Sequence, residues 1–178
     1  AALHLWTGSP IEDPIRNTRI YGNTIYSSFS SAIALWSTRG IYDTKIFNNL
    51  VITANNQKLV VGTRDRSIET FVGNNYWSVD GKYDIAGYKS LEEWQKATGQ
   101  EMLNGKPVGM VVDPKVTNLG SNPTIGDLTK LYMLVAYRLQ KDSPRRRRDT
   151  EHAGGNTLCP SRSQSHQKGD SVSLLFPR

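Results

Sequence analysis

The charged residues best placed for acid–base chemistry fall in loops that recur along this chain. Removing a proton next to a carboxylate, the first step of a β-elimination, needs a cation that neutralises the carboxylate and a base that takes the proton. If the loops stack, Arg39 lies near Arg64 or Arg66. The candidate catalytic residues are therefore Arg39, Arg64, Asp65 and Arg66. Solvated loop charges are the simpler interpretation of the same residues.

Two other chemistries find less support in the sequence. Hydrolysis of a glycosidic bond needs two carboxyl groups at a fixed separation. The carboxylates near these loops do not share an outward position on one predicted strand; they are Glu12, Asp13, Asp43 and Asp65. No cysteine and histidine cluster has the spacing of a zinc site, so we expect no metal from the residue pattern.

The loops belong to a repeat of 26 residues. Residues 41–52, IYDTKIFNNLVI, match residues 15–26, IRNTRIYGNTIY, and more loosely residues 67–77, SIETFVGNNYW. A period of about 20–50 residues is typical of a solenoid, whose units bury their apolar faces by stacking. Each unit alternates apolar and polar residues, as strands do. Three sets are expected to stack: Thr18, Thr44 and Thr70; Ile20, Ile46 and Val72; and Asn23, Asn49 and Asn75.

The asparagines fall where two strands of a unit meet at a bend. Asn and Gly tolerate the left-handed conformation that such a bend needs. The predicted bends are Gly22-Asn23, Asn48-Asn49 and Asn74-Asn75. Stacked asparagines can hydrogen-bond in a column, which satisfies amides whose burial otherwise costs about 1–3 kcal/mol each. We therefore predict a structural ladder of Asn23, Asn49 and Asn75.

A third strand completes each unit. Residues 1–6, 31–36 and 57–62 share one apolar pattern. We expect two stacked pairs between the last two segments: Ile33 over Leu59 and Leu35 over Val61. Three parallel strands per turn make a parallel β-helix, so residues 1–79 are predicted to form about three coils.

The chain resembles a known superfamily through these motifs. TRIYGNTIY, TKIFNNLVI and TFVGNNYW make residues 1 to about 77 similar to the right-handed parallel β-helix superfamily that includes pectate lyases. YKSLEEWQKATGQE, VVDP and YRLQKDSP resemble the C-terminal extension of bacterial secreted β-helix proteins. The resemblance implies an all-β fold, a secreted or cell-surface location, and a polysaccharide or cell-surface glycan as partner. It also allows calcium as a cofactor, although no residue pattern indicates one.

In that superfamily polysaccharide lies along the first sheet, flanked by its loops. The outward residues there include His4, Trp6 and Trp36, with Lys58 and Val60 in the third unit. Indoles stack on sugar rings through their apolar faces, so His4, Trp6 and Trp36 are the candidate substrate-binding residues. Packing of both tryptophans under the flanking loops is the alternative, and a lone histidine is more often structural or merely exposed.

Two function hypotheses follow from the resemblance. The first is a C-terminal fragment of a secreted polysaccharide-processing protein, a lyase or glycoside hydrolase, without turnover by itself. Since the chain begins inside a repeat, we expect further coils upstream in the parent protein. The second is a non-catalytic β-helix for glycan binding or surface display, because one coil serves enzymes, adhesins and scaffolds alike.

Composition narrows the class of protein. The net charge is +6, but residues 141–178 hold 8 Lys/Arg and 4 Asp/Glu, whereas residues 1–140 hold 14 and 12. The nearly balanced body gives no case for a polyanion partner, and the basic run 145–148 alone does not indicate nucleic-acid binding. No apolar run approaches the roughly 18 residues of a membrane span. The single cysteine, Cys159, forms no internal disulfide. We expect a monomer.

The repeat ends near residue 79, and residues 80–143 are predicted to form an extension that packs on the coil. Ser90 and Glu93 form a capping box for a helix over residues 90–98, and Gly99 suits its C-terminal end. Residues 109–114 are expected to form a short strand, and residues 131–139 an extended segment. Residues 144–178 lack apolar periodicity, so we predict a disordered basic and polar tail.

Overall fold

A computed structural model describes residues 1–7, 14–37, 40–62, 69–121, 127–133 and 135–144. Three repeats each place one strand in each of three parallel sheets. The first sheet holds β1 (Leu3–Thr7), β5 (Ile33–Ser37) and β9 (Val60–Val61). The second holds β3 (Arg19–Tyr21), β7 (Thr44–Phe47) and β10 (Glu69–Val72). The third holds β4 (Thr24–Ser27), β8 (Leu50–Thr53) and β11 (Asn75–Ser78).

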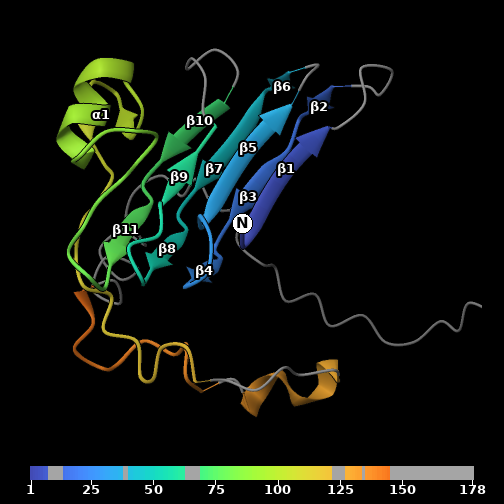
Figure 1. Cartoon of the computed structure of the whole chain (residues 1–178), viewed down its shortest axis with the longest axis vertical. Helices are drawn as coiled ribbons and strands as arrows, with labels where there is room; N and C mark the ends of the chain where they lie inside the picture. Colours follow the sequence, from blue (N-terminus) through green and yellow to red (C-terminus); the bar gives the residue numbers. More distant parts are fainter. Residues whose placement is uncertain (8–13, 38–39, 63–68, 122–126, 134, 145–178) are drawn as a thin grey trace, which may run out of the picture.

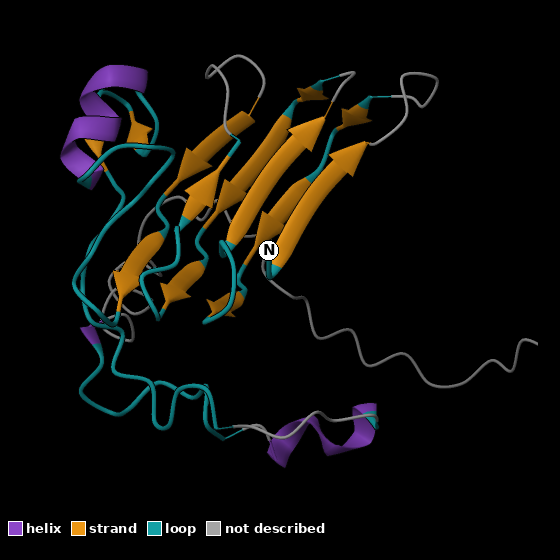
Figure 2. Cartoon of the chain, viewed as in Figure 1, coloured by secondary structure: helices purple, strands orange, loops and turns teal. Residues whose placement is uncertain are grey.

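The predicted parallel stacking of these strands is confirmed. Every pair within the three sheets is parallel and joins one repeat to the next. A short additional pair, β2 (Ile15–Arg16) with β6 (Ile41–Tyr42), precedes β3 and β7 and is also parallel. Figures 1 and 2 show the strands of successive repeats side by side, from β1 at one end of the stack to β10 and β11 at the other. The architecture is mainly β and β-helix-like.

The core runs between the sheets as columns of inward side chains. Ile46, Val51 and Ile33 of the second repeat are fully buried. Phe71 and Tyr76 continue two of these columns into the third repeat, since Phe71 pairs with Ile46 and Tyr76 with Val51. Burial of apolar surface is the main term that holds such repeats together, at about 25 cal/mol per Å².

The predicted register of the third repeat is wrong by one residue. Phe71, not Val72, pairs with Ile46, while Val72 pairs with Phe47 and Thr70 with Lys45. The residues just before each bend explain the shift, because all three adopt the left-handed conformation. They are Gly22 (φ 67), Asn48 (φ 53) and Gly73 (φ 69). The chain therefore bends at Gly73-Asn74, as it does at Gly22-Asn23, rather than at Asn74-Asn75.

The first sheet also departs from the predicted register between its last two strands. Ile33 pairs with Val60 rather than Leu59, and Ala34 pairs with Val61. Val60 is therefore buried and not outward. A shift of one residue exchanges the two faces of a strand, so Val61 takes the outward position that the sequence assigned to Val60.

The extension continues the pairing of the repeats in reduced form. Ile85 bridges to Val60 on the first sheet, and Met110 bridges to Asn75 on the third. On the second, the Glu101 N–H donates to the Phe71 carbonyl at 2.8 Å. The segment from Ile85 to Met110 thus follows the path of another repeat, with α1 (Leu91–Thr98) inserted in it.

Helix α1 forms as its end signals predict. The Ser90 hydroxyl accepts the Glu93 N–H at 3.1 Å, and Gly99 has a left-handed φ of 68°. The Glu93 carboxylate reaches back to the Lys89 N–H at 3.0 Å. Leu91 and Trp94 are the buried residues of α1, so this face covers the end of the stack next to β10 and β11 (Figure 1).

The remaining predicted elements are only partly present. The expected strand over residues 109–114 is reduced to the Met110 bridge. The expected extended segment over residues 131–139 begins in a 3₁₀ helix, η1 (Leu128–Met133), and is extended only near Leu139, which bridges to Val116. A small hairpin not predicted from the sequence joins β12 (Met102–Leu103) to β13 (Lys106–Pro107). The predicted disordered tail lies outside the described residues, apart from Pro144.

Candidate functional site

The outer face of the first sheet carries the predicted aromatic residues in register. Trp6 pairs with Trp36, and His4 with Ala34, across adjacent parallel strands. The two tryptophans are 64% and 53% exposed. More than half of each indole side chain is therefore accessible on this face. His4 lies beside Trp6, with ring centroids 6.3 Å apart.

Gly62 permits the close packing beside Trp36. Its φ is 76°, and a Cβ atom built there would lie 2.1 Å from the Leu35 carbonyl oxygen and 3.2 Å from Trp36 Cε2. Only glycine fits such a contact without displacement of the neighbouring strand. Gly62 of the third repeat thus lies close to the indole of Trp36.

The candidate catalytic residues cannot be placed on this face. Arg39, Arg64, Asp65 and Arg66 all lie outside the described residues. The strands β1, β5 and β9 themselves carry no carboxylate in their sequences LHLWT, IALWS and VV. What this face offers is therefore two exposed indoles and one imidazole, a surface suited to stacking on a flat apolar ligand face.

The asparagine ladder exists, but its third member is Asn74 and not Asn75. Asn49 Oδ1 accepts the backbone N–H and the side-chain N–H of Asn23, at 3.1 and 3.0 Å. Asn74 Oδ1 accepts the same two groups of Asn49, both at 3.0 Å. Asn49 and Asn74 are fully buried. Each amide thus donates to the next repeat and accepts from the previous one.

Glu101 occupies the next position of this ladder. Its carboxylate accepts the Asn74 side-chain N–H at 2.6 Å and the Asn74 backbone N–H at 3.2 Å. The Tyr76 hydroxyl donates to it at 2.8 Å. Burial raises the Glu101 pKa from 4.5 to about 7, although hydrogen bonds from Asn74 and Tyr76 favour the charged form. Burial, with the Glu101 charge, also raises the Tyr76 pKa.

Gln100 completes the edge of the second sheet beside Glu101. Its side-chain oxygen accepts the Phe71 N–H at 2.8 Å, and its side-chain N–H donates to the Glu69 carbonyl at 2.9 Å. The amide thus replaces the peptide group that a further parallel strand would present to β10. The sequence interpretation missed both residues. Their signal was spacing, because Glu101 follows Asn74 by 27 residues.

Asn75 has a different role from the predicted one. Its side chain accepts the Val112 N–H at 3.0 Å and donates to the Val112 carbonyl at 2.9 Å. These paired bonds fasten the segment after Met110 along β11 and so direct residues 113–121 across the third sheet. Asn75 is therefore an anchor for the extension and not a member of the ladder.

No group of three or more His, Cys, Asp or Glu side chains within the described ranges is arranged to hold a metal ion. None of the helices in those ranges has the length and apolar character that crossing a bilayer requires. Comparisons with protein-family models, with curated proteins and with solved structures find no match to this chain.

Proposed function

We propose that this chain is a right-handed parallel β-helix of the pectate-lyase-like superfamily, and that it binds polysaccharide on the outer face of its first sheet. The observation that carries the proposal is the register of Trp6 with Trp36 on adjacent strands, both more than half exposed. The motif resemblance supports the superfamily, and it also supports a secreted or cell-surface bacterial protein.

Two neighbouring indoles exposed to water favour a ligand that covers them. Exposed tryptophans are uncommon on a surface without a partner, because each offers about 150–250 Å² for burial. Neighbouring parallel strands lie about 4.8 Å apart, so in-register indoles form a continuous apolar strip. A polysaccharide chain presents alternating apolar ring faces and hydroxyls, which fit such a strip, and His4 can hydrogen-bond a hydroxyl at its end.

The residues on the outer face of the first sheet favour polysaccharide binding without turnover. General acid–base catalysis needs groups within hydrogen-bond reach of the reacting proton, and the strands of the first sheet provide His4 alone as a titratable group with Trp6 and Trp36. Polysaccharide processing as a lyase or hydrolase would depend on Arg39, Arg64, Asp65 and Arg66. No described contact yet favours it over binding.

The binding test is affinity electrophoresis of the purified chain in gels that contain neutral or uronate polysaccharides. Retardation that Trp6→Ala and Trp36→Ala each abolish would support the proposal. Phe29→Ala is the matched control, since Phe29 is an aromatic residue that is 92% exposed in a turn outside the first sheet. Equal effects of the Phe29 and tryptophan variants, or no retardation on any polysaccharide, would reject it.

Turnover is tested on the same panel by following unsaturated products and reducing ends. We expect neither to form. Product formation that disappears in Arg39→Ala, Arg64→Ala or Arg66→Ala would replace the binding proposal with a catalytic one centred on those loops.

A further inference from the structure

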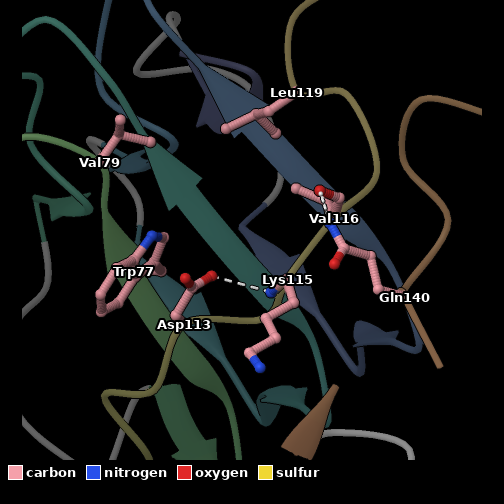
Figure 3. Close-up of a pocket in the computed structure, with 7 residues that line it drawn as sticks. All are labelled: Trp77, Val79, Asp113, Lys115, Val116, Leu119 and Gln140. Atoms are coloured by element: carbon pink, nitrogen blue, oxygen red, sulfur yellow. Dashed lines mark hydrogen bonds between the residues drawn. The ribbon is translucent and has the colours of Figure 1, made fainter. Parts of the chain in front are cut away.

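A second surface with the chemistry of a sugar site lies on the outer side of the third sheet. A hollow of about 440 Å³ opens there between β11 and the extension. Its lining side chains are Trp77, Val79, Asp113, Lys115, Val116, Leu119 and Gln140. Figure 3 shows Trp77 and Val79 on one side and Val116, Leu119 and Gln140 on the other. The volume falls within the roughly 300–1,000 Å³ of ligand pockets.

The apolar part of the hollow comes from two sides. Trp77 and Val79 lie two residues apart, so they share the outer face. Tyr76 and Ser78, on either side of Trp77, are buried, and Tyr76 packs against Trp94. Trp77 is only half-buried and Val79 is 52% exposed. Leu119 is half-buried across the hollow. An indole that lines such a hollow offers a stacking surface for a flat apolar ligand face.

The polar part of the hollow consists of one ion pair, a second carboxylate and an amide. The Asp113 carboxylate accepts the Lys115 backbone N–H at 2.8 Å, and the Lys115 ammonium forms an ion pair with Asp142. Gln140 donates to the Val116 carbonyl at 3.2 Å. A carboxylate, an ammonium and an amide have capacity for further hydrogen bonds after these contacts. Because two carboxylates, Asp113 and Asp142, accompany the one Lys115 ammonium, the hollow disfavours an anion and favours a neutral ligand with many hydroxyl groups.

The walls of the hollow are held by hydrogen bonds within the chain. The Gln140 N–H donates to the Lys115 carbonyl at 2.8 Å, and the Thr117 N–H donates to the Arg138 carbonyl at 2.9 Å. The buried Ser143 hydroxyl donates to the Pro114 carbonyl at 2.7 Å. A wall that is already ordered loses little conformational entropy when a ligand binds.

We propose that this hollow binds a neutral pyranose unit. One ring face stacks on Trp77, and the hydroxyls hydrogen-bond to Asp113, Lys115 and Gln140. This site shares the ligand class of the proposed function but uses a different sheet and no common residue. The two proposals can therefore fail separately.

The test uses nuclear magnetic resonance of the full chain with ¹⁵N-labelled indoles. The chain has four tryptophans, so each indole N–H reports one place: Trp6 and Trp36 the first sheet, Trp77 the hollow, and Trp94 the core. We expect cellotetraose or mannotetraose at about 10 mM to shift the Trp77 signal, since a Kd near 1 mM is then almost saturated. The buried Trp94 signal should not move, and tetragalacturonate should shift Trp77 less.

Single-residue variants distinguish ligand binding at the hollow from ligand binding on the first sheet. Gln140→Ala should raise the Kd read from the Trp77 indole signal. Trp77→Ala, which lacks that signal and is followed by the backbone amide signals of the uniformly ¹⁵N-labelled chain, should raise the Kd by about tenfold. Trp36→Ala is the matched control and should leave the titration of the Trp77 signal unchanged. Gln140 is exposed, so its variant keeps the test valid if Trp77→Ala does not fold. No Trp77 shift with either neutral probe, or loss of that shift in Trp36→Ala, would overturn the site.

Discussion

The first and last members of the asparagine ladder in this chain differ in their surroundings. Next to the third repeat, Glu101 and Gln100 satisfy the ladder and the edge of β10, and α1 covers the core. At the first repeat, Asn23 is exposed, and Leu3 and Ile20 are only half-buried. Figure 1 shows the two ends on opposite sides of the stack.

This difference indicates how a column of hydrogen bonds between stacked repeats can be terminated. An asparagine amide both donates and accepts, so it passes the pattern from one repeat to the next. A carboxylate accepts and has no N–H to donate, so Glu101 receives the bonds of Asn74 and ends the column. At the other end, Asn23 donates its side-chain N–H into the stack, to Asn49 Oδ1. The ladder therefore has a direction, and its two ends need different partners.

The largest effect is expected from removing the aromatic side chain that covers the Glu101 end. Trp94 is 1% exposed and packs edge-on against Phe71, with ring centroids 5.1 Å apart. Trp94→Ala should lower the free energy of unfolding by about 3–5 kcal/mol, since it leaves a large cavity. Urea denaturation measures the loss. The control is Trp6→Ala at the other end, where an exposed site predicts a change within about 0.5 kcal/mol. Equal losses of unfolding free energy in Trp94→Ala and Trp6→Ala would contradict the proposed difference between the two ends of the ladder.

Stability should also depend on pH through Glu101. The folded pKa is about 7 against 4.5 for the free side chain, so the folded state binds more protons between these values. The stabilising contribution of the protonated form is present below pH 4.5 and is lost as pH rises toward 7. The loss is about 3 kcal/mol, from 1.36 kcal/mol per pKa unit.

The pH effect is isolated by comparing the native chain with Glu101→Gln. Unfolding is measured at several pH values, and the difference between the two proteins removes the contributions of other carboxylates. We expect this difference to change steadily between about pH 4.5 and 7. A difference that stays constant across that range would show that Glu101 does not titrate there.

The middle of the ladder provides the third comparison. Asn49 is fully buried and donates its side-chain N–H groups to Asn74 and to the Ile20 carbonyl. Asn49→Ala should cost about 1–3 kcal/mol because buried partners lose their hydrogen bonds. Thermal or urea unfolding checks this value. An unchanged stability would count against the ladder as a stabilising element.

The smallest effect is expected at the open end. Asn23→Ala removes bonds to Asn49 from an exposed position, where water can replace them, so about 0.5 kcal/mol is expected. The same unfolding assay compares Asn23→Ala directly with Asn49→Ala. A larger loss for Asn23 than for Asn49 would contradict the assignment of Asn23 to an exposed end.

The sequence alone determined the features that depend on local patterns. The 26-residue match between the first two repeats predicted the pairing of Ile20 with Ile46, which the structure has. Ser90, Glu93 and Gly99 predicted both ends of α1. Such signals act over a few residues or repeat with near identity, so a single sequence is enough to recognise them.

Only the tertiary structure decided the third repeat, because the sequence there offers Asn74 and Asn75 as alternatives. With Asn74 as the third member of the ladder, Phe71 rather than Val72 faces inward. Phe71 then packs against Trp94, 23 positions further along the chain. A slip of one residue exchanges the faces of a strand, so this distant contact acts together with the left-handed bend at Gly73 to set the register of β10. The same choice leaves Asn75 to anchor Val112 and brings Glu101 under Asn74. These contacts join segments with no shared local pattern, so they arise from packing and could not be predicted from periodicity.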